Sequence, residues 1–183
     1  GSAVRSDGKS ASLTAPNGGA QYEMLTAAWA RAALGGGVES HGTGTALGDP
    51  VEVGALARFA AGAATCVRGI KASVGHLEPA AAVAGLASLR AERGIAPNVM
   101  LRVLNARLFG SGLCFTCAST GDIEAWRGLS SFGYSGTIAH AVLRCEGVAV
   151  AIMGPAATST MPKYQRLAFL WREQPHPMAQ YHL

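Results

Sequence analysis

The chain has 183 residues, of which 49% are hydrophobic and 14% charged, and its formal net charge is +4. This length suits one domain or one half of a larger one, and so little charge suggests a surface partly covered by a partner. The scattered basic residues disfavour a nucleic-acid-binding face, and no apolar stretch is long enough to span a membrane.

The four cysteines are too few and too dispersed for a disulfide framework. With a polar N-terminus that shows no signal peptide, they favour a reducing compartment, cytoplasmic or organellar. Cys114 and Cys117 form a lone C-x-x-C pair, which cannot complete a zinc site by itself. We interpret the pair as two strand residues on one face and expect no metal site.

The first third of the chain predicts a helix and a strand that lead to a histidine. Residues 1–19 are turn-rich. Apolar residues then recur at three- and four-residue steps, which predicts an amphipathic helix over 20–34, ended by the glycines at 35–37. A short strand over 38–40 would deliver His41 at its end.

A second helix has a clear start signal. Asp49 is expected to act as the N-cap, Pro50 suits the first helical position, and Glu52 stands where a capping box places its carboxylate. This helix should run to about Ala61, and a strand over 66–70 should follow.

The remaining elements are an alanine-rich helix and several short strands. Residues 79–93 predict a helix rich in small residues, interpreted as a buried core helix. Beyond it the pattern predicts strands at 99–104, 113–117, 127–131, 137–143 and 148–153. We expect one domain over 1–146, followed by an extended strap or linker over 147–183.

Two histidines in matching contexts are the sharpest functional signal. His41 and His76 each follow a predicted strand, and each has a glycine beside it, Gly42 or Gly75. On rigid loops at strand ends, the two imidazoles could donate N–H bonds to negative charge developing on one carbonyl oxygen. The alternative is that each is a structural histidine, but two such contexts in one chain favour a shared site.

Two other motifs suggest alternative functions. Gly42 to Gly48 approximates a dinucleotide-binding fingerprint, but its third glycine falls at the wrong step, so the signal is weak. Gly133 to Thr137 resembles a hydrolase nucleophile elbow around Ser135, but threonine replaces the final glycine. We therefore reject a serine hydrolase.

These motifs together resemble a known family. His41 to Thr45, with Gly48 to Glu52, is similar to the first histidine motif of β-ketoacyl synthases, especially ketosynthase domains of modular polyketide synthases. Lys71 to Glu78 resembles their second histidine motif, and 128–140 their C-terminal Ser-Ser-Phe-Gly signature. The resemblance covers residues 4–143 in the order that the family has them.

The resemblance implies a fold and a set of site residues. The fold is thiolase-like α/β, with two halves in α-β-α-β-α layers, and this chain would supply the C-terminal half. His41 and His76 would stabilise the enolate formed when a malonyl thioester loses carbon dioxide, and Lys71 would orient or charge-balance the second histidine. Substrate binding is assigned by the resemblance to five further residues: Thr43, Thr45, Phe132, Gly133 and Tyr134. Tyr134 would take the gating aromatic position, where the family usually has phenylalanine.

The resemblance also implies partners. The nucleophilic cysteine of the family belongs to the N-terminal half, and none of the four cysteines here is a credible substitute, so the chain alone is expected to be inactive. We expect no cofactor, with substrates presented as thioesters on the phosphopantetheine of an acyl carrier protein. The expected protein partners are that carrier, the N-terminal half and a second copy in a homodimer. A non-catalytic ketosynthase-like scaffold or dimerisation module stays open, and a nucleotide-binding domain is an outlier.

Overall fold

The computed structural model describes nine stretches of the chain: 1–8, 15–32, 37–63, 65–91, 98, 101, 103–108, 110–115 and 125–145. The strands within them are β1 (Ser2–Ser6), β2 (Val38–Glu39), β3 (Val67–Arg68), β4 (Ala125–Phe132) and β5 (Thr137–Cys145). The helices are α1 (Gly18–Ala28), α2 (Gly48–Ala60), α3 (Lys71–Val74) and α4 (Ala81–Ala91), with 3-10 turns η1 (Glu78–Ala80) and η2 (Ala106–Leu108).

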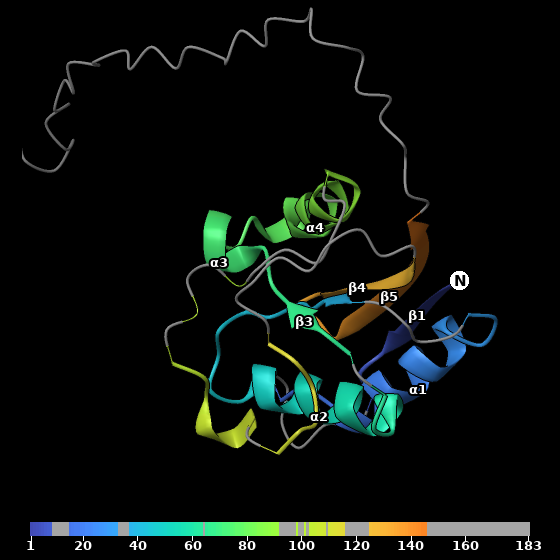
Figure 1. Ribbon diagram of the computed structural model, residues 1–183, viewed down its shortest axis with the longest axis horizontal. Helices are drawn as coiled ribbons and strands as arrows, with labels where there is room; N and C mark the ends of the chain where they lie inside the picture. The colour runs from blue at the N-terminus through green and yellow to red at the C-terminus, as the bar shows by residue number, and fades with distance from the viewer. Residues whose placement is uncertain are drawn as a thin grey trace, which may run out of the picture. The chain divides into compact units, whose positions relative to one another are not determined.

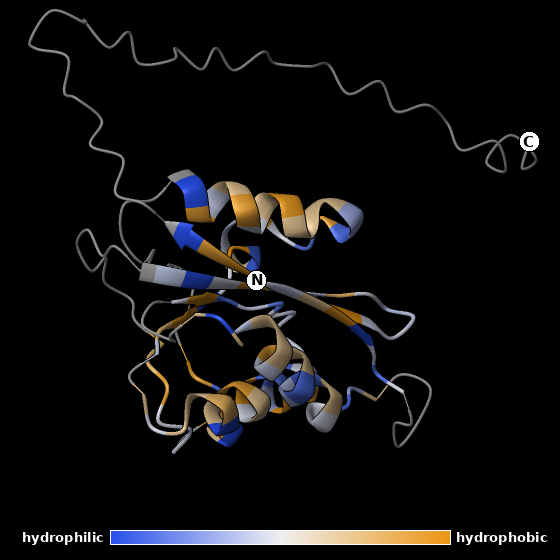
Figure 2. Ribbon diagram, turned by 90° about the vertical axis from the view of Figure 1, so that its right-hand side faces the viewer, coloured by the Kyte–Doolittle hydropathy of each residue, from blue (hydrophilic) through white to orange (hydrophobic). Residues whose placement is uncertain are grey.

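These strands form one mixed sheet in the order β1-β5-β4-β2-β3. β2 runs parallel to both β3 and β4, whereas β4 and β5 form an antiparallel hairpin and β1 is antiparallel to β5. Helices α1 and α2 cover one face of the sheet and α3 and α4 lie on the other, as both views show (Figures 1 and 2). The described residues are thus an α-β-α sandwich.

The main hydrophobic core lies between the sheet and α1 and α2. Met24 and Leu25 of α1, Val38 of β2, Leu56 of α2 and Ile138 of β5 are all nearly inaccessible to solvent. Burial of such side chains removes apolar area from water, which is the main favourable term in folding. The core therefore fixes the strand β2 that delivers the first histidine.

The N-terminal region differs from the sequence-based prediction. Ser2–Ser6 is a strand rather than a turn, because β5 supplies the hydrogen-bonding partners that this short polar segment cannot indicate by itself. Helix α1 begins at Gly18, where the Asn17 side chain accepts the backbone N–H of Gly19 at 3.0 Å, and it ends at Ala28 rather than at residue 34. Trp29 is the C-cap: its backbone N–H still donates to the Leu25 carbonyl at 3.0 Å, and the residue is buried in the core.

The start of α2 also corrects the predicted cap. The helix begins at Gly48 after Leu47, which makes no side-chain cap. Asp49 instead accepts the backbone N–H of Gly44, at 3.1 Å. The predicted capping box is therefore wrong, and Glu52, described below, binds the histidine loop instead of its own helix terminus.

Helix α4 is not fully buried, in contrast to the prediction of a core helix over 79–93. Ala81 and Leu89 are buried, but Val83 is 66% exposed. A Cβ on Gly85 would lie 2.8 Å from Leu129 Cδ1, so a small residue there lets α4 approach β4 closely. A helix that lies on one face of a sheet packs with only one of its sides, so the opposite side of α4 remains exposed.

The predicted strands are partly confirmed. The strands at 127–131 and 137–143 are confirmed as β4 and β5, which are somewhat longer. The strand at 66–70 is reduced to β3 because Ile70 already turns into α3, and the strand at 113–117 is reduced to an isolated bridge at Cys114. The described residues of 99–104 are not in a strand. The strand at 148–153 and the strap over 147–183 lie outside the described residues.

Candidate active site

The two predicted histidines lie side by side at one edge of the sheet. His41 follows β2, and His76 follows α3, which continues from β3. Because β2 and β3 are parallel, with Glu39 paired to Arg68, their carboxyl ends meet at the same edge. The imidazole centroids are 5.5 Å apart and the rings are nearly perpendicular, at 81°. The structure thus brings together two residues that are far apart in the sequence.

The tautomer of His41 follows from its neighbours. The backbone N–H of Phe132 donates to His41 Nδ1 at 3.3 Å, and the two rings have centroids 5.1 Å apart. Since Nδ1 accepts a hydrogen bond, the ring proton resides on Nε2. Burial, with the nearby charges of Lys71 and His76, lowers the pKa of His41 from 6.5 to about 4. His41 is therefore neutral at pH 7 and donates through Nε2.

His76 has the same tautomer by a different route. Its Nδ1 accepts the backbone N–H of Glu78 at 2.9 Å, which again leaves the proton on Nε2. Gly75, immediately before it, has a φ of 78°, a conformation in which a side chain would be strained. The ring is more exposed than that of His41. Both imidazoles are thus set as Nε2 donors by backbone groups.

A buried carboxylate holds the loop that carries His41. Glu52 Oε1 accepts the backbone N–H of His41 at 2.7 Å, and Oε2 accepts that of Gly42 at 2.9 Å. Burial raises the pKa of Glu52 from 4.5 to about 7, although the two N–H donors act in the opposite direction. Gly42 has a φ of 43°, and a Cβ there would lie 2.7 Å from Ser40 Oγ. Glu52 and Gly42 together fix the backbone on which His41 stands.

Lys71, the predicted charge-balancing residue, lies among several carboxylates. Partial burial lowers the pKa of its ammonium group, while the negative charges of Glu39, Glu52 and Asp49 raise it. Lys71 also helps to keep the pKa of His41 low. The charge of Lys71, a residue of α3, therefore also acts on the loop that carries His41.

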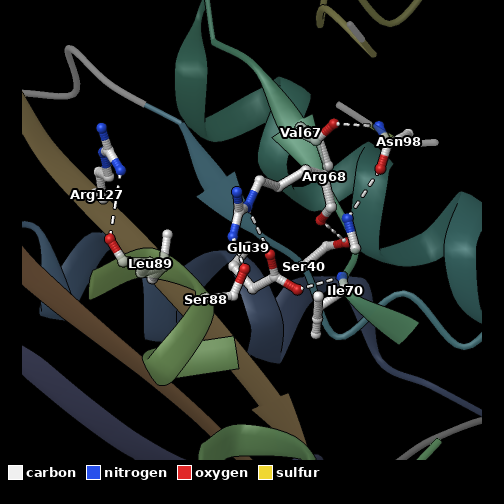
Figure 3. A network of polar contacts seen from close by, with 10 residues as sticks. Glu39, Ser40, Val67, Arg68, Ile70, Ser88, Leu89, Asn98 and Arg127 are labelled. Atoms are coloured by element: carbon white, nitrogen blue, oxygen red, sulfur yellow. Dashed lines mark hydrogen bonds and ion pairs between the residues drawn. The ribbon is translucent and has the colours of Figure 1, made fainter. Parts of the chain in front are cut away.

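A second buried carboxylate holds the segment that leads to Lys71 and His76 (Figure 3). Glu39 Oε2 forms an ion pair with Arg68 Nε at 2.7 Å, and both side chains are almost fully buried. Glu39 Oε1 accepts the backbone N–H of Ile70 at 2.6 Å. Arg68 also donates to Ser88 Oγ of α4 at 2.6 Å. Glu39 thus ties β2 to the turn that begins α3.

Two further side chains complete this network. Ser40 Oγ donates to the Arg68 carbonyl at 2.8 Å. Asn98 accepts the backbone N–H of Gly69 at 3.0 Å and donates to the Val67 carbonyl at 3.0 Å (Figure 3). The sequence prediction missed these residues, because nothing in the local pattern indicates a polar network closed between parallel strands. A signal in the sequence was the acidic residue Glu39 within the predicted short strand over 38–40.

The predicted substrate-binding residues fall into two groups. Thr43 and Thr45 have hydroxyls 3.2 Å apart, and Thr45 Oγ1 accepts the backbone N–H of Gly48 at 3.1 Å. Thr43 also lines a cavity of about 390 Å³ that includes Glu52 and Lys71. Both threonines therefore belong to the loop after His41, and Thr43 also forms part of the cavity lining.

The second group lies at the β4–β5 turn. Phe132 contacts His41 through both its ring and its backbone N–H. The backbone N–H of Gly133 donates to the Thr137 carbonyl at 2.7 Å, which closes the turn. Tyr134, the predicted gate, is 93% exposed at the tip of this turn. Phe132 is therefore the member of this group that the structure places against the histidine pair.

The described cysteines lie away from the histidine edge. Cys66 precedes β3 and bridges to Cys114, so both stand at the end of β3 opposite to the one that leads to His76. The side chains of Cys117 and Cys145 lie outside the described part of the chain. Among the described residues no group of three or more His, Cys, Asp or Glu side chains could hold a metal ion.

Comparisons with known proteins agree with this fold and site. The profile of the family described as "Beta-ketoacyl synthase, C-terminal domain" matches residues 1–99. Erythronolide synthase EryA3 of Saccharopolyspora erythraea is 36% identical over 170 residues, covering 78% of this chain and 5% of that protein. The 6-methylsalicylic acid synthase of Aspergillus niger is 40% identical over 165 residues, covering 78% and 9%.

Solved structures show the same relationship. The ketosynthase from module 6 of the bacillaene synthase of Bacillus subtilis 168 superposes with a TM-score of 0.72 at 28% identity, covering 80% of this chain and 30% of that one. An oxazolomycin ketosynthase domain, OzmH KS8 of Streptomyces albus JA3453, gives a TM-score of 0.70 at 30% identity, covering 81% and 44%.

The fold and these neighbours define a thiolase-like α/β protein, as predicted. The chain belongs to the β-ketoacyl synthase family, of which it contains the C-terminal domain. It spans less than a tenth of the length of the two curated relatives named above and less than half of the two solved ketosynthase chains. In the described residues no helix is both long and apolar enough to cross a membrane.

Proposed function

We propose that this chain supplies the two-histidine half of a β-ketoacyl synthase that condenses malonyl and acyl thioesters with loss of carbon dioxide. One observation carries the proposal: His41 and His76 lie 5.5 Å apart, and each accepts a backbone N–H at Nδ1, so that each keeps its proton on Nε2. A pair of N–H donors suits the developing charge of an enolate oxygen.

The proposed reaction uses these donors at the decarboxylation step. When the bond between the malonyl carboxylate and the α-carbon breaks, its electron pair moves toward the thioester carbonyl and charge develops on that oxygen. His41 and His76 would donate Nε2–H bonds to it. The α-carbon would then attack the acyl carbon of a cysteine thioester, breaking its C–S bond and releasing the cysteine thiolate. Donors fixed before the reaction need no reorganisation at the transition state.

The partners proposed for this reaction follow from the family and from one exposed face. Helices α3 and α4, with the turn between them, expose a row of apolar side chains: Val74 (50%), Leu77 (44%), Val83 (66%) and Leu86 (36%). An apolar face of this kind is typical of a protein interface. We assign it to the cysteine-bearing half, and assign thioester delivery to the phosphopantetheine of an acyl carrier protein, without a further cofactor. A homodimer is the proposed assembly.

Carbon dioxide release tests the proposal. The chain is incubated with malonyl-carrier protein, alone and with a cysteine-bearing ketosynthase half. Release is expected only in the combined sample. His41→Ala and His76→Ala should each lower the rate by roughly 10²–10³-fold, the usual cost of removing one oxyanion donor.

The matched control is His182→Ala, a histidine outside the described residues, which should keep the full rate. Equal rates for all three variants would contradict the role of the histidine pair. If a correctly folded combined sample releases no carbon dioxide, the chain is a non-catalytic ketosynthase-like scaffold.

A further inference from the structure

Two cysteines that the proposed reaction does not use stand directly opposite each other in the sheet. Cys114 forms an isolated parallel bridge with Cys66. Its backbone N–H donates to the Thr65 carbonyl at 2.9 Å, and its carbonyl accepts the N–H of Val67 at 2.8 Å. Neighbouring strands lie about 4.8 Å apart, which is within the Cα separation of about 4.4–6.8 Å that a disulfide needs.

The two thiols also face each other and differ in access. Both cysteines are free, and the thiol of Cys114 is close enough to Cys66 to influence its pKa. Cys114 is exposed, whereas Cys66 is half-buried. Burial, together with the neighbouring thiol, raises the pKa of Cys66. A reagent in solution therefore meets Cys114 first, with Cys66 directly behind it.

We infer that Cys66 and Cys114 form a dithiol oxidation site, which a small disulfide such as oxidised glutathione closes to an intramolecular disulfide. The Cys114 thiolate attacks one sulfur of the glutathione disulfide, breaks its S–S bond and releases one glutathione thiolate. Cys66 loses its proton, attacks the Cys114 sulfur of the mixed disulfide and releases the second glutathione. Two protein thiols are oxidised and one small disulfide is reduced to two thiols.

The position of this site connects it to the cavity beside the histidine loop. Val67 follows Cys66, Phe115 follows Cys114, and both line the same cavity as Thr43 and Lys71. A disulfide would join the two chain segments that contribute Val67 and Phe115 to the cavity lining. The inference does not depend on the proposed condensation reaction, because its test measures covalent bonds and not activity.

Mass spectrometry of a variant that keeps only these two cysteines tests the inference. The chain has four cysteines, so the Cys117→Ser, Cys145→Ser background keeps only this pair. The folded background protein is incubated with mixtures of oxidised and reduced glutathione and is then alkylated. We expect an intact mass lower by two hydrogen atoms, without bound glutathione. Trypsin should release Phe59–Arg68 linked to Leu108–Arg127.

Two comparisons sharpen the result. Adding Cys66→Ser to the background should leave glutathione bound to Cys114, because no second thiol can displace it. In urea the linked form should decrease, since only the fold holds the two cysteines together. A glutathione adduct that persists in the pair-containing chain would overturn the inference. The inference would also be overturned if the Cys66–Cys114 disulfide formed to the same extent in urea. The same holds if a Cys114–Cys117 disulfide were the main product in the chain with all four cysteines.

Discussion

At the scale of single residues, the site is set by hydrogen bonds from the backbone. His41 and His76 accept from different backbone groups, yet the N–H donors of Phe132 and Glu78 leave both rings with the same tautomer. A ring that accepts at Nδ1 carries its single proton on Nε2 and can donate it there. The low pKa of His41, about 4, keeps this ring neutral, with Nδ1 able to accept, well below pH 7.

Glu52 should give the chain a distinctive pH dependence. Its pKa is raised in the folded state from 4.5 to about 7, so its contribution to stability is full below pH 4.5 and is lost as the pH rises through 7. Relative to Glu52→Gln, the free energy of unfolding should fall by ~3 kcal/mol between these pH values. Urea titrations at several pH values measure this difference. Glu23→Gln, at an exposed position of α1, is the control, and parallel curves for the wild type and Glu52→Gln would refute the assignment.

A buried histidine away from the site should contribute to stability in the opposite pH direction. His140 Nε2 accepts the indole N–H of Trp29 at 2.9 Å, and its Nδ1 bonds to Ser130 Oγ at 2.9 Å. Burial lowers the pKa of His140 to about 4, so this stability is present above pH 6.5 and is lost as the pH falls through 4.

Trp29→Phe should therefore destabilise the fold at neutral pH. It leaves a buried ring nitrogen without its donor, which costs about 1–3 kcal/mol. Chemical unfolding monitored by circular dichroism measures the loss. Trp126→Phe, the same change at a partly exposed ring of β4, should cost less. Equal losses would show that ring volume, and not the hydrogen bond, decides the effect.

At the scale of elements, each histidine segment is held by its own buried carboxylate. Glu52 of α2 holds the loop after β2, and Glu39 of β2 holds the turn after β3. The second interaction passes through Arg68 to Ser88, and so connects α4 to the same edge of the sheet. Parallel strands need such ties because their ends are joined by long connections rather than by tight turns.

Arg68→Met should test the tie between β2 and β3. It leaves the Glu39 carboxylate buried without its cation, which typically costs about 3–5 kcal/mol. In the double variant Glu39→Gln, Arg68→Met both charges of this ion pair are removed, so part of this loss should be recovered. Urea unfolding of the wild type, both single variants and the double variant gives the coupling energy. Strictly additive losses would mean that the ion pair does not couple the strands.

At the scale of the whole molecule, the described residues bury one side of α4 and expose the other. Ala81, Gly85 and Leu89 lie against the sheet, whereas Val83 and Leu86 face away. The low fraction of charged residues, 14%, agrees with a surface that is partly covered in the assembled protein. Expressed alone, such a chain should self-associate or bind hydrophobic dyes.

Replacing both Val83 and Leu86 with glutamate should reduce dye binding and self-association. The substitutions add charge to an exposed apolar face. Any fall in the unfolding midpoint should come mainly from Leu86, which is 36% exposed, rather than from Val83, which is 66% exposed. ANS fluorescence and sedimentation velocity measure the two effects. Val103→Glu, at an 85% exposed position outside α4, is the control. If both proteins bind dye and associate equally, the α4 face is not responsible.

Some parts of this protein could be predicted from local patterns. The family, the histidine pair and the long elements α2, α4, β4 and β5 carry strong motifs or regular periodicity. Strand β1 could not be predicted, because its polar residues form a strand only when β5 supplies backbone partners. The length of α1 was overestimated because the apolar pattern continues past Ala28, whereas the backbone leaves helical geometry at Trp29.

The sequence by itself determined which residues could act, because glycines and histidines in a fixed order restrict the local backbone. Only the tertiary structure decided how they are set. The tautomers of His41 and His76, the use of Glu52 on the loop instead of the helix cap, and the pairing of Cys66 with Cys114 all depend on contacts between distant segments. Such contacts form only when parallel strands and their helices pack together, and no local pattern records them.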